Sequence, residues 1–193
     1  QLVAVADAMP AAAKELAAKY GCEVRSIDEI EAAKDIDAVV ICTPTNTHAD
    51  LIERFAKAGK AIFCEKPIDF DLNRIDGALK SVELAKVKFQ VGFTRRFDPN
   101  FRKVRDLVAE GKVGQPHLLR ITSRDPGPPP PEYVKVSGGI FLDMTIHDFD
   151  MARWMLNEEP VEAFAYGAAL VDPAVAAAGD IDSCMVLLRC ASG

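Results

Sequence analysis

Short apolar runs alternate with helical segments through the first half of the chain, and this alternation constrains the fold more than any other feature. Residues 2–6 (LVAVA), 37–43 (DAVVICT) and 60–65 (KAIFCE) are apolar almost throughout, as is typical of strands that helices cover on both faces. Amphipathic segments such as residues 48–58 lie between the runs. We therefore expect a Rossmann-like, doubly wound parallel α/β domain over residues 1–100.

Local signals place the remaining elements of this domain. Pro10 and Gly21 mark the start and the end of a helix over residues 10–20. Ser26 and Glu29 have the spacing of a capping box, which predicts a second helix to about residue 34. The other elements that we expect are a helix over residues 72–85 and strands over residues 22–25 and 87–93.

The pattern changes after Gly92, and we place the domain boundary between residues 94 and 114. A proline-rich loop at 125–131 is too stiff and too poor in donors for a helix or a central strand. The expected elements around it are helices at 101–110 and 141–156 and strands at 115–122, 161–170 and 183–190. Residues 101–193 thus predict a separate α+β domain with a mainly antiparallel, open sheet.

Composition excludes several classes of partner. The net charge is −6, and Lys and Arg form no basic block, so we expect no nucleic-acid binding. No apolar run approaches the ~20 residues of a membrane helix, so we expect no membrane span. The five cysteines show no metal or redox spacing, which favours buried thiols in a reducing compartment, the cytoplasm.

Asp7 follows the first expected strand and has two interpretations that the sequence leaves open. An acidic residue at this place in a dinucleotide-binding domain accepts hydrogen bonds from the adenosine ribose and repels a 2′-phosphate. It could equally cap the helix that begins at Pro10. No G-x-G-x-x-G motif occurs in the chain, and we expect one within roughly 30 residues upstream of Gln1, since the sequence begins inside a strand.

Polar residues follow two further strands, where ligands of open α/β sheets bind. The segment 43–48 (TPTNTH) ends one strand and begins a helix, although small polar residues also make ordinary helix caps. Lys66 follows the next strand and is stiffened by Pro67. An ammonium group there could polarise a carbinol oxygen, whereas a solvated lysine is the ordinary alternative.

Asp143 and His147 are four residues apart on an expected helix and so share one face. A carboxylate beside a histidine fixes its tautomer and stabilises the imidazolium that forms when it accepts a proton. The pair could also be an ordinary surface pair. No further His or Cys completes a metal site, so we expect no metal.

Five segments occur in a recognisable order: the strand that ends at Asp7, TPTNTHADL, AGKAIFCEKP, VGFTRRFDPNF and SGGIFLDMTIHDFDMARWM. In this order they resemble the Gfo/Idh/MocA oxidoreductases over essentially the whole chain. The absent glycine loop departs from the family pattern, and family members normally continue past Gly193. The resemblance therefore implies a chain that is incomplete at both ends and inactive by itself.

The resemblance assigns roles to individual residues. It implies a catalytic set of Lys66, Asp143 and His147. The residues it places on the NAD side are Asp7, Thr43, Asn46, His48, Glu65 and Lys66. Those it places on the substrate side are Arg95, Asp125, Asp143 and His147.

The implied activity is polyol catabolism: NAD-dependent oxidation of a ring CH–OH of myo-inositol to a ketone, in a homotetramer. His147 would take the hydroxyl proton and Lys66 would stabilise the developing alkoxide. Two alternatives stay open. One is a dehydrogenase of another sugar or inositol isomer, and the other is a ligand-sensing protein on the same fold that does not turn over.

Overall fold

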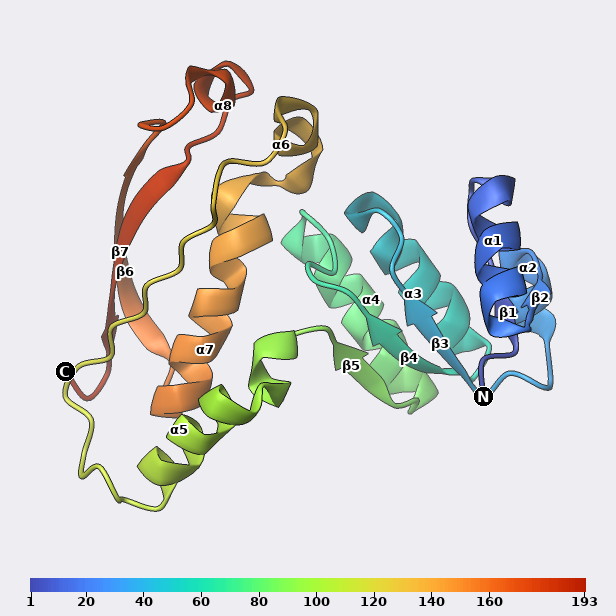
Figure 1. Ribbon diagram of the computed structural model, residues 1–193. Helices are drawn as coiled ribbons and strands as arrows, with labels where there is room; N and C mark the ends of the chain where they lie inside the picture. The colour runs from blue at the N-terminus through green and yellow to red at the C-terminus, as the bar shows by residue number, and fades with distance from the viewer. The chain divides into compact units, whose positions relative to one another are not determined.

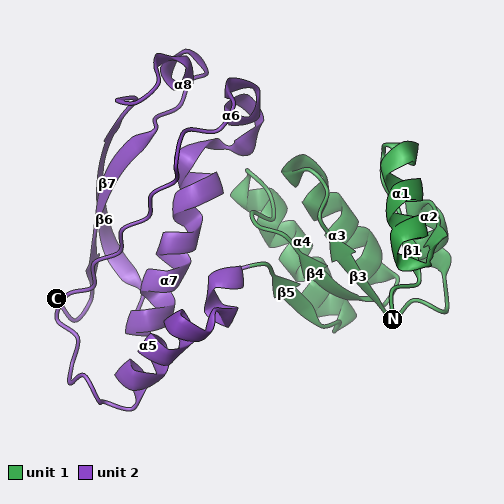
Figure 2. Cartoon of the chain, in the orientation of Figure 1, with its two compact units in different colours: residues 1–92 green, residues 93–193 purple.

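The computed structural model describes residues 1–193 (Figure 1). The chain forms two compact units, residues 1–92 and residues 93–193 (Figure 2). From the sequence we expect the boundary between residues 94 and 114, with the domains divided at residue 100. In the structure Arg95 and Arg96 form ion pairs with Asp148 and Asp150, so the segment before residue 100 packs with the second unit.

The first unit alternates strands and helices as the sequence predicts. Its elements are β1 (Ala4–Val5), α1 (Pro10–Tyr20), β2 (Glu23–Val24), α2 (Ile27–Ala32), β3 (Ala38–Ile41), η1 (Thr45–Thr47), α3 (His48–Lys57), β4 (Ala61–Cys64), α4 (Leu72–Ala85) and β5 (Phe89–Val91). The predicted punctuation is confirmed. Gly21 ends α1 in the left-handed conformation at φ 66°, and Ser26 and Glu29 make both bonds of a capping box.

All strand pairs of the first unit are parallel. The strands β3, β4 and β5 form one sheet in that order, and β1 and β2 form a separate ladder. Ile41 pairs with Cys64, and Cys64 pairs with Val91. The carboxyl ends of the three strands therefore meet at one edge, as a Rossmann-like sheet requires.

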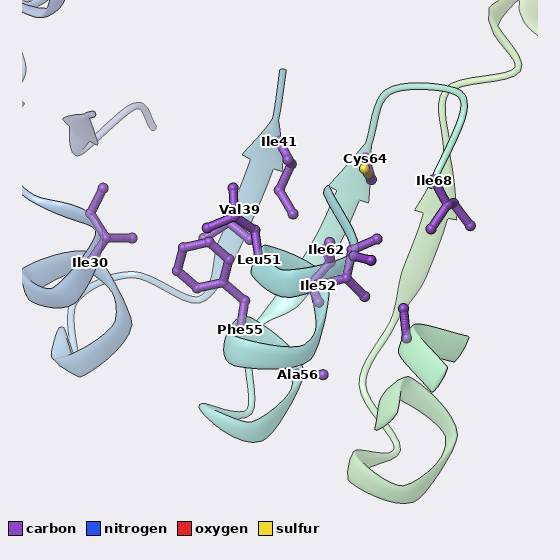
Figure 3. Packing of buried hydrophobic residues seen from close by; sticks show 12 residues of the cluster. Ile30, Val39, Ile41, Leu51, Ile52, Phe55, Ala56, Ile62, Cys64 and Ile68 are labelled. Carbon is purple, nitrogen blue, oxygen red and sulfur yellow. The ribbon is translucent and has the colours of Figure 1, made fainter. Parts of the chain in front are cut away.

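The core of this unit lies between the sheet and α3. Leu51, Ile52 and Phe55 of α3 cluster with alternate strand residues such as Ile41 and Ile62 (Figure 3). The expectation that the strands are buried on both faces is wrong for β3, because the side chain of Val40 is 70% exposed. A continuous apolar run indicates that helices can cover both faces of a strand. The packing of the helices decides which faces they do cover.

The second unit combines helices with an antiparallel pair of strands. Its elements are η2 (Thr94–Phe97), α5 (Pro99–Ala109), α6 (Pro131–Ser137), η3 (Phe141–Thr145), α7 (Ile146–Leu156), β6 (Pro160–Ala168), α8 (Pro173–Ala177) and β7 (Ser183–Cys190). The strands β6 and β7 pair antiparallel along almost their whole length, which confirms the predicted α+β class. None of the helices in either unit is long and apolar enough to cross a membrane.

Three local predictions for the second unit are corrected. Residues 115–122 form no strand, because alternating residues make a strand only where a partner accepts their backbone bonds. The short helices α6 and α8 were not predicted, although each begins with a proline in its first turn. The first five residues of the helix expected at 141–156 form the π-helical turn η3 instead.

Candidate active site

The carboxyl edge of the parallel sheet collects the predicted polar residues of the first unit. Thr43 and Asn46 follow β3 and are exposed, while Glu65 and Lys66 follow β4 and are half-buried. Since Ile41 and Cys64 are paired across the two strands, the chain leaves both strands at the same level. The four side chains therefore belong to one edge of the sheet.

The segment after β3 is held by its own hydroxyl groups. The hydroxyl groups of Thr43 and Thr47 are 2.6 Å apart, and the backbone N–H and the hydroxyl of Thr47 both donate to the carbonyl of Pro44. These bonds fold η1 into a compact turn. Asn46, at the centre of the turn, consequently remains at the surface.

His48 is the most deeply buried of the predicted site residues, with 1% of its surface exposed. Its Nδ1 is 2.8 Å from the carbonyl oxygen of Pro67, and its Nε2 is 2.7 Å from that of Thr43. Both ring nitrogens thus face backbone acceptors. The imidazole thereby links the backbone of the loop after β3 to the backbone of the loop after β4 at the carboxyl edge of the sheet.

Glu65 lies against the end of the neighbouring strand. A Cβ atom at Gly92 would be 2.9 Å from Glu65 Oε2, so any larger residue there would displace the Glu65 carboxylate. The N–H of Gly92 also donates to the carbonyl of Cys64. The glycine after β5 therefore makes room for the Glu65 carboxylate at the edge of the sheet.

Asp7 is exposed at the end of β1. Its Oδ1 accepts the N–H of Met9 at 2.7 Å, which orders the turn before α1. Met9, rather than Asp7, occupies the N-cap of that helix. The carboxylate keeps acceptor capacity beyond this bond, since an ionised carboxylate can accept about four hydrogen bonds.

The catalytic candidates of the second unit lie at a junction between two kinds of helix. Asp143 is in the π-helical turn η3, and His147 is in the first turn of α7. Both side chains are half-buried. The ring of Phe93 meets the His147 ring edge-on at 6.5 Å between centroids. π-Helical turns occur frequently at functional sites, where they redirect side chains.

Tyr133 of α6 contacts the candidate site and was not predicted from the sequence. Its hydroxyl donates to Asp143 Oδ1 at 3.0 Å. Partial burial, and then the neighbouring Asp143 carboxylate, raise the pKa of the Tyr133 phenol. Its position ten residues before Asp143 was the one available signal.

The two predicted substrate residues differ in their surroundings. Asp125 is exposed in the proline-rich loop. Arg95 is half-buried and forms an ion pair with Asp148, and its Nη1 also lies 3.3 Å from the Ser123 hydroxyl. Arg95 is therefore already engaged within the second unit. No group of three or more His, Cys, Asp or Glu side chains is arranged to hold a metal ion.

The edge of the first unit fits a dinucleotide such as NAD. Exposed hydroxyl and amide groups follow β3, a carboxylate follows β1, and the carboxyl ends of parallel strands are where such sheets bind nucleotides. A parallel α/β unit joined to an α+β unit that carries a carboxylate and a histidine is an arrangement found in two-domain, dinucleotide-dependent oxidoreductases.

Comparison with known families agrees with this class. Residues 1–93 match the oxidoreductase family with the NAD-binding Rossmann fold, and residues 101–193 match the GFO/IDH/MocA C-terminal domain. The chain belongs to the GFO/IDH/MocA family of oxidoreductases.

Individual relatives are similar over the whole chain. Inositol 2-dehydrogenase of Rhizobium meliloti (strain 1021) is 64% identical over 193 residues, which are 100% of this chain and 58% of that protein. The structure of a myo-inositol dehydrogenase from Corynebacterium glutamicum has a TM-score of 0.93 and 42% identity, over 100% of this chain and 58% of that one. The chain thus spans less than two thirds of the length of these relatives.

A third relative was crystallised with ligands. The structure of scyllo-inositol dehydrogenase from Lactobacillus casei with bound NAD(H) and scyllo-inositol has a TM-score of 0.90 and 34% identity. The match covers 100% of this chain and 59% of the chain in that structure.

Proposed function

We propose that the protein is an NAD-dependent inositol 2-dehydrogenase that oxidises a ring CH–OH of myo-inositol to a ketone. The observation that carries the proposal is the Asp143–His147 segment, in which a carboxylate and an imidazole lie at a π–α junction with a tyrosine donor on the carboxylate. The similarity to inositol dehydrogenases supports the substrate class.

In the proposed reaction the residues of this chain handle the proton and the negative charge. His147 accepts the proton of the substrate hydroxyl, and Asp143 stabilises the resulting imidazolium. The ammonium of Lys66 stabilises the alkoxide as it develops. NAD, when bound, would supply the acceptor for the hydride that leaves the carbinol carbon. The alkoxide oxygen then becomes the carbonyl oxygen of the ketone.

The residues that we propose to hold NAD are Asp7, Thr43, Asn46, Glu65 and Lys66, with His48 ordering the loops behind them. The carboxylate of Asp7 would accept hydrogen bonds from the ribose hydroxyls and repel a 2′-phosphate, which favours NAD over NADP. Asp125, Asp143 and His147 would contact the polyol. Arg95, which the resemblance also places there, forms an ion pair with Asp148 within the second unit.

Initial-rate measurements test the proposal. The purified full-length protein should reduce NAD with myo-inositol, and His147→Ala in that protein should abolish NADH formation while NAD binding, measured by calorimetry, stays nearly unchanged. His117→Ala provides a matched control outside the proposed site and should keep the wild-type rate. An unchanged rate in His147→Ala would refute the role of that residue.

A second substrate is favoured by a specific observation, because one relative was crystallised with scyllo-inositol. Rates with myo-inositol, scyllo-inositol and glucose separate the candidates. Activity with scyllo-inositol or glucose but none with myo-inositol would replace the favoured substrate. Ligand binding without NADH formation from any polyol would favour a sensing protein.

We further propose a homotetramer in the cytoplasm. All five cysteines are free thiols, which suits a reducing compartment. One face of the β6–β7 sheet carries large exposed apolar side chains, which suits contact with other copies of the chain.

A further inference from the structure

The segment around η2 contacts the first turns of α7 at three points. The ring of Phe93 meets His147 edge-on, Arg95 pairs with Asp148, and Arg96 pairs with Asp150. Three residues between positions 93 and 96 thus contact three residues between positions 147 and 150. We call this set of contacts the η2–α7 clasp.

The Arg95 contact is a closed triangle. Nη1 of Arg95 donates to Asp148 Oδ1 and lies 3.3 Å from the Ser123 hydroxyl, which itself donates to the same Oδ1 at 2.6 Å. The guanidinium charge is thereby balanced by a carboxylate immediately after His147. Arg95 is consequently hydrogen-bonded to the residue that follows the imidazole in the sequence.

The Arg96 contact anchors the clasp. Asp150 is 4% exposed, and Arg96 donates to both of its oxygens, at 2.8 Å from Nε and 2.5 Å from Nη2. The guanidinium also lies over the Trp154 ring at 5.9 Å. A buried carboxylate requires such a partner, so η2 and α7 cannot separate without leaving a charge unpaired.

We propose that Arg95 and Arg96 are positioning residues, which hold the first turn of α7, and with it His147, through Asp148 and Asp150. Arg95 then acts through Asp148 and does not recognise a substrate hydroxyl. The inference rests on the proposed function, because it assigns how the proposed proton acceptor is kept in place.

Steady-state kinetics of Arg95→Gln, Asp148→Asn and the double variant separate positioning from substrate contact. If both residues act through one interaction, each single variant lowers kcat by roughly 10- to 100-fold and changes KM by no more than about twofold. The kcat of the double variant is then no lower than that of the less active single variant. A KM that rises tenfold or more in Arg95→Gln at unchanged kcat, with Asp148→Asn like wild type, overturns the inference.

Glu159→Gln is the matched control. It removes an ion pair with Arg153, at 2.6 Å, from the other end of the same helix. Its kcat and KM should equal those of the wild type. A loss of kcat as large as in Asp148→Asn would mean that removal of any ion pair on α7 lowers kcat. The specific role of the clasp would then be refuted.

The NMR signals of the His147 ring give a readout that needs no turnover. They are assigned by their loss in His147→Gln. We expect them to shift and broaden in Arg95→Gln and to stay unchanged in Glu159→Gln; unchanged signals in Arg95→Gln overturn the inference. If Arg95→Gln does not fold, Ser123→Ala removes one corner of the triangle and is judged by the same signals. A full-length wild-type protein that forms no NADH refutes the proposed function, whereas the ring signals still test the clasp.

Discussion

The phenol of Tyr133 controls how the Asp143 carboxylate is presented. A hydrogen bond to a carboxylate is stronger than one between neutral groups, and it also limits rotation of the carboxylate. Tyr133 reaches Asp143 from α6, while His147 follows Asp143 on the next element, so the phenol holds the carboxylate from outside its own helix.

Tyr133→Phe removes this donor and leaves the ring in place. We expect kcat/KM for the proposed oxidation of inositol to fall roughly tenfold, because a hydrogen bond to a charged group contributes about 1.5–3 kcal/mol where it is buried and less where it is partly exposed. Steady-state NADH formation measures the change. Tyr20→Phe, on the exposed surface of α1, should leave the rate unaltered. Equal rates for both variants would refute the proposed role of Tyr133 in the site.

Lys60 stabilises the first unit from within. The side chain is 4% exposed, and its ammonium donates to the carbonyls of Ala33 and Ile36 at 2.7 and 2.9 Å, just after the end of α2. Lys60→Met keeps the length of the chain but leaves both carbonyls without this donor. We expect a loss of about 2–4 kcal/mol in the free energy of unfolding, measured in urea.

Lys57→Met supplies the comparison for Lys60. Lys57 is 70% exposed and lies 3.7 Å from Glu53 in a surface ion pair, so its replacement should change the free energy of unfolding by less than about 0.5 kcal/mol. A loss at Lys60 no larger than at Lys57 would contradict the structural role.

At the scale of elements, the sequence predicts what depends on neighbours along the chain. The capping box of α2 and the glycine after α1 are local, and both form as predicted. Lys66 and Asn46 could be assigned to one edge because parallel strands end together. The burial of His48 could not be predicted, since its partner Pro67 lies 19 residues away.

The π-helical turn shows the same limit in the second unit. Asp180 Oδ2 accepts the N–H of Ile140 from 40 residues away, and the other oxygen of that carboxylate would lie 2.9 Å from a Cβ atom on Gly139. These contacts lie at the start of η3, which the helical periodicity of residues 141–156 predicts as an ordinary helix. Long-range contacts of this kind, rather than local propensity, decide how the helix begins.

Asp182 orders the connection between β6 and β7. Its carboxylate accepts three successive backbone N–H groups, from Leu170, Val171 and Asp172, at 2.8 to 3.0 Å. The bond from Asp172 is the largest cause that lowers the pKa of Asp182 from 3.8 to about 2. Because the pKa is lower in the folded state, the stability that it contributes is present above about pH 4 and is lost as the pH falls toward 2.

Asp182→Asn should therefore lower Tm at neutral pH and make Tm fall less steeply between about pH 4 and pH 2. Thermal unfolding followed by circular dichroism at a series of pH values measures both effects. Asp76→Asn, which changes an exposed carboxyl group of α4, should reproduce the wild-type dependence. Parallel Tm curves for Asp182→Asn and wild type would show that the carboxylate does not carry this acid sensitivity.

At the scale of the whole molecule, the β6–β7 sheet has two unlike faces. Ala163, Ala165, Val186 and Leu188 line one face, which with Phe141 and Phe149 encloses a pocket of about 350 Å³. The other face presents four large apolar side chains that are 68 to 80% exposed: Phe164, Tyr166, Met185 and Leu187. Cross-strand pairing joins Phe164 to Leu187 and Tyr166 to Met185, so the four form one continuous patch.

Leu187→Glu places a charge within this patch and should dissociate the proposed tetramer. A contiguous exposed apolar patch of this kind marks an interface, and the Glu162–Arg189 ion pair at its margin matches the polar rim of such surfaces. Light scattering coupled to size-exclusion chromatography should give a smaller mass for Leu187→Glu than for wild type. Leu84→Glu, at an exposed leucine of α4 outside the patch, should retain the wild-type mass. A monomeric wild type, or a Leu187→Glu protein of unchanged mass, would exclude this face as the contact between copies.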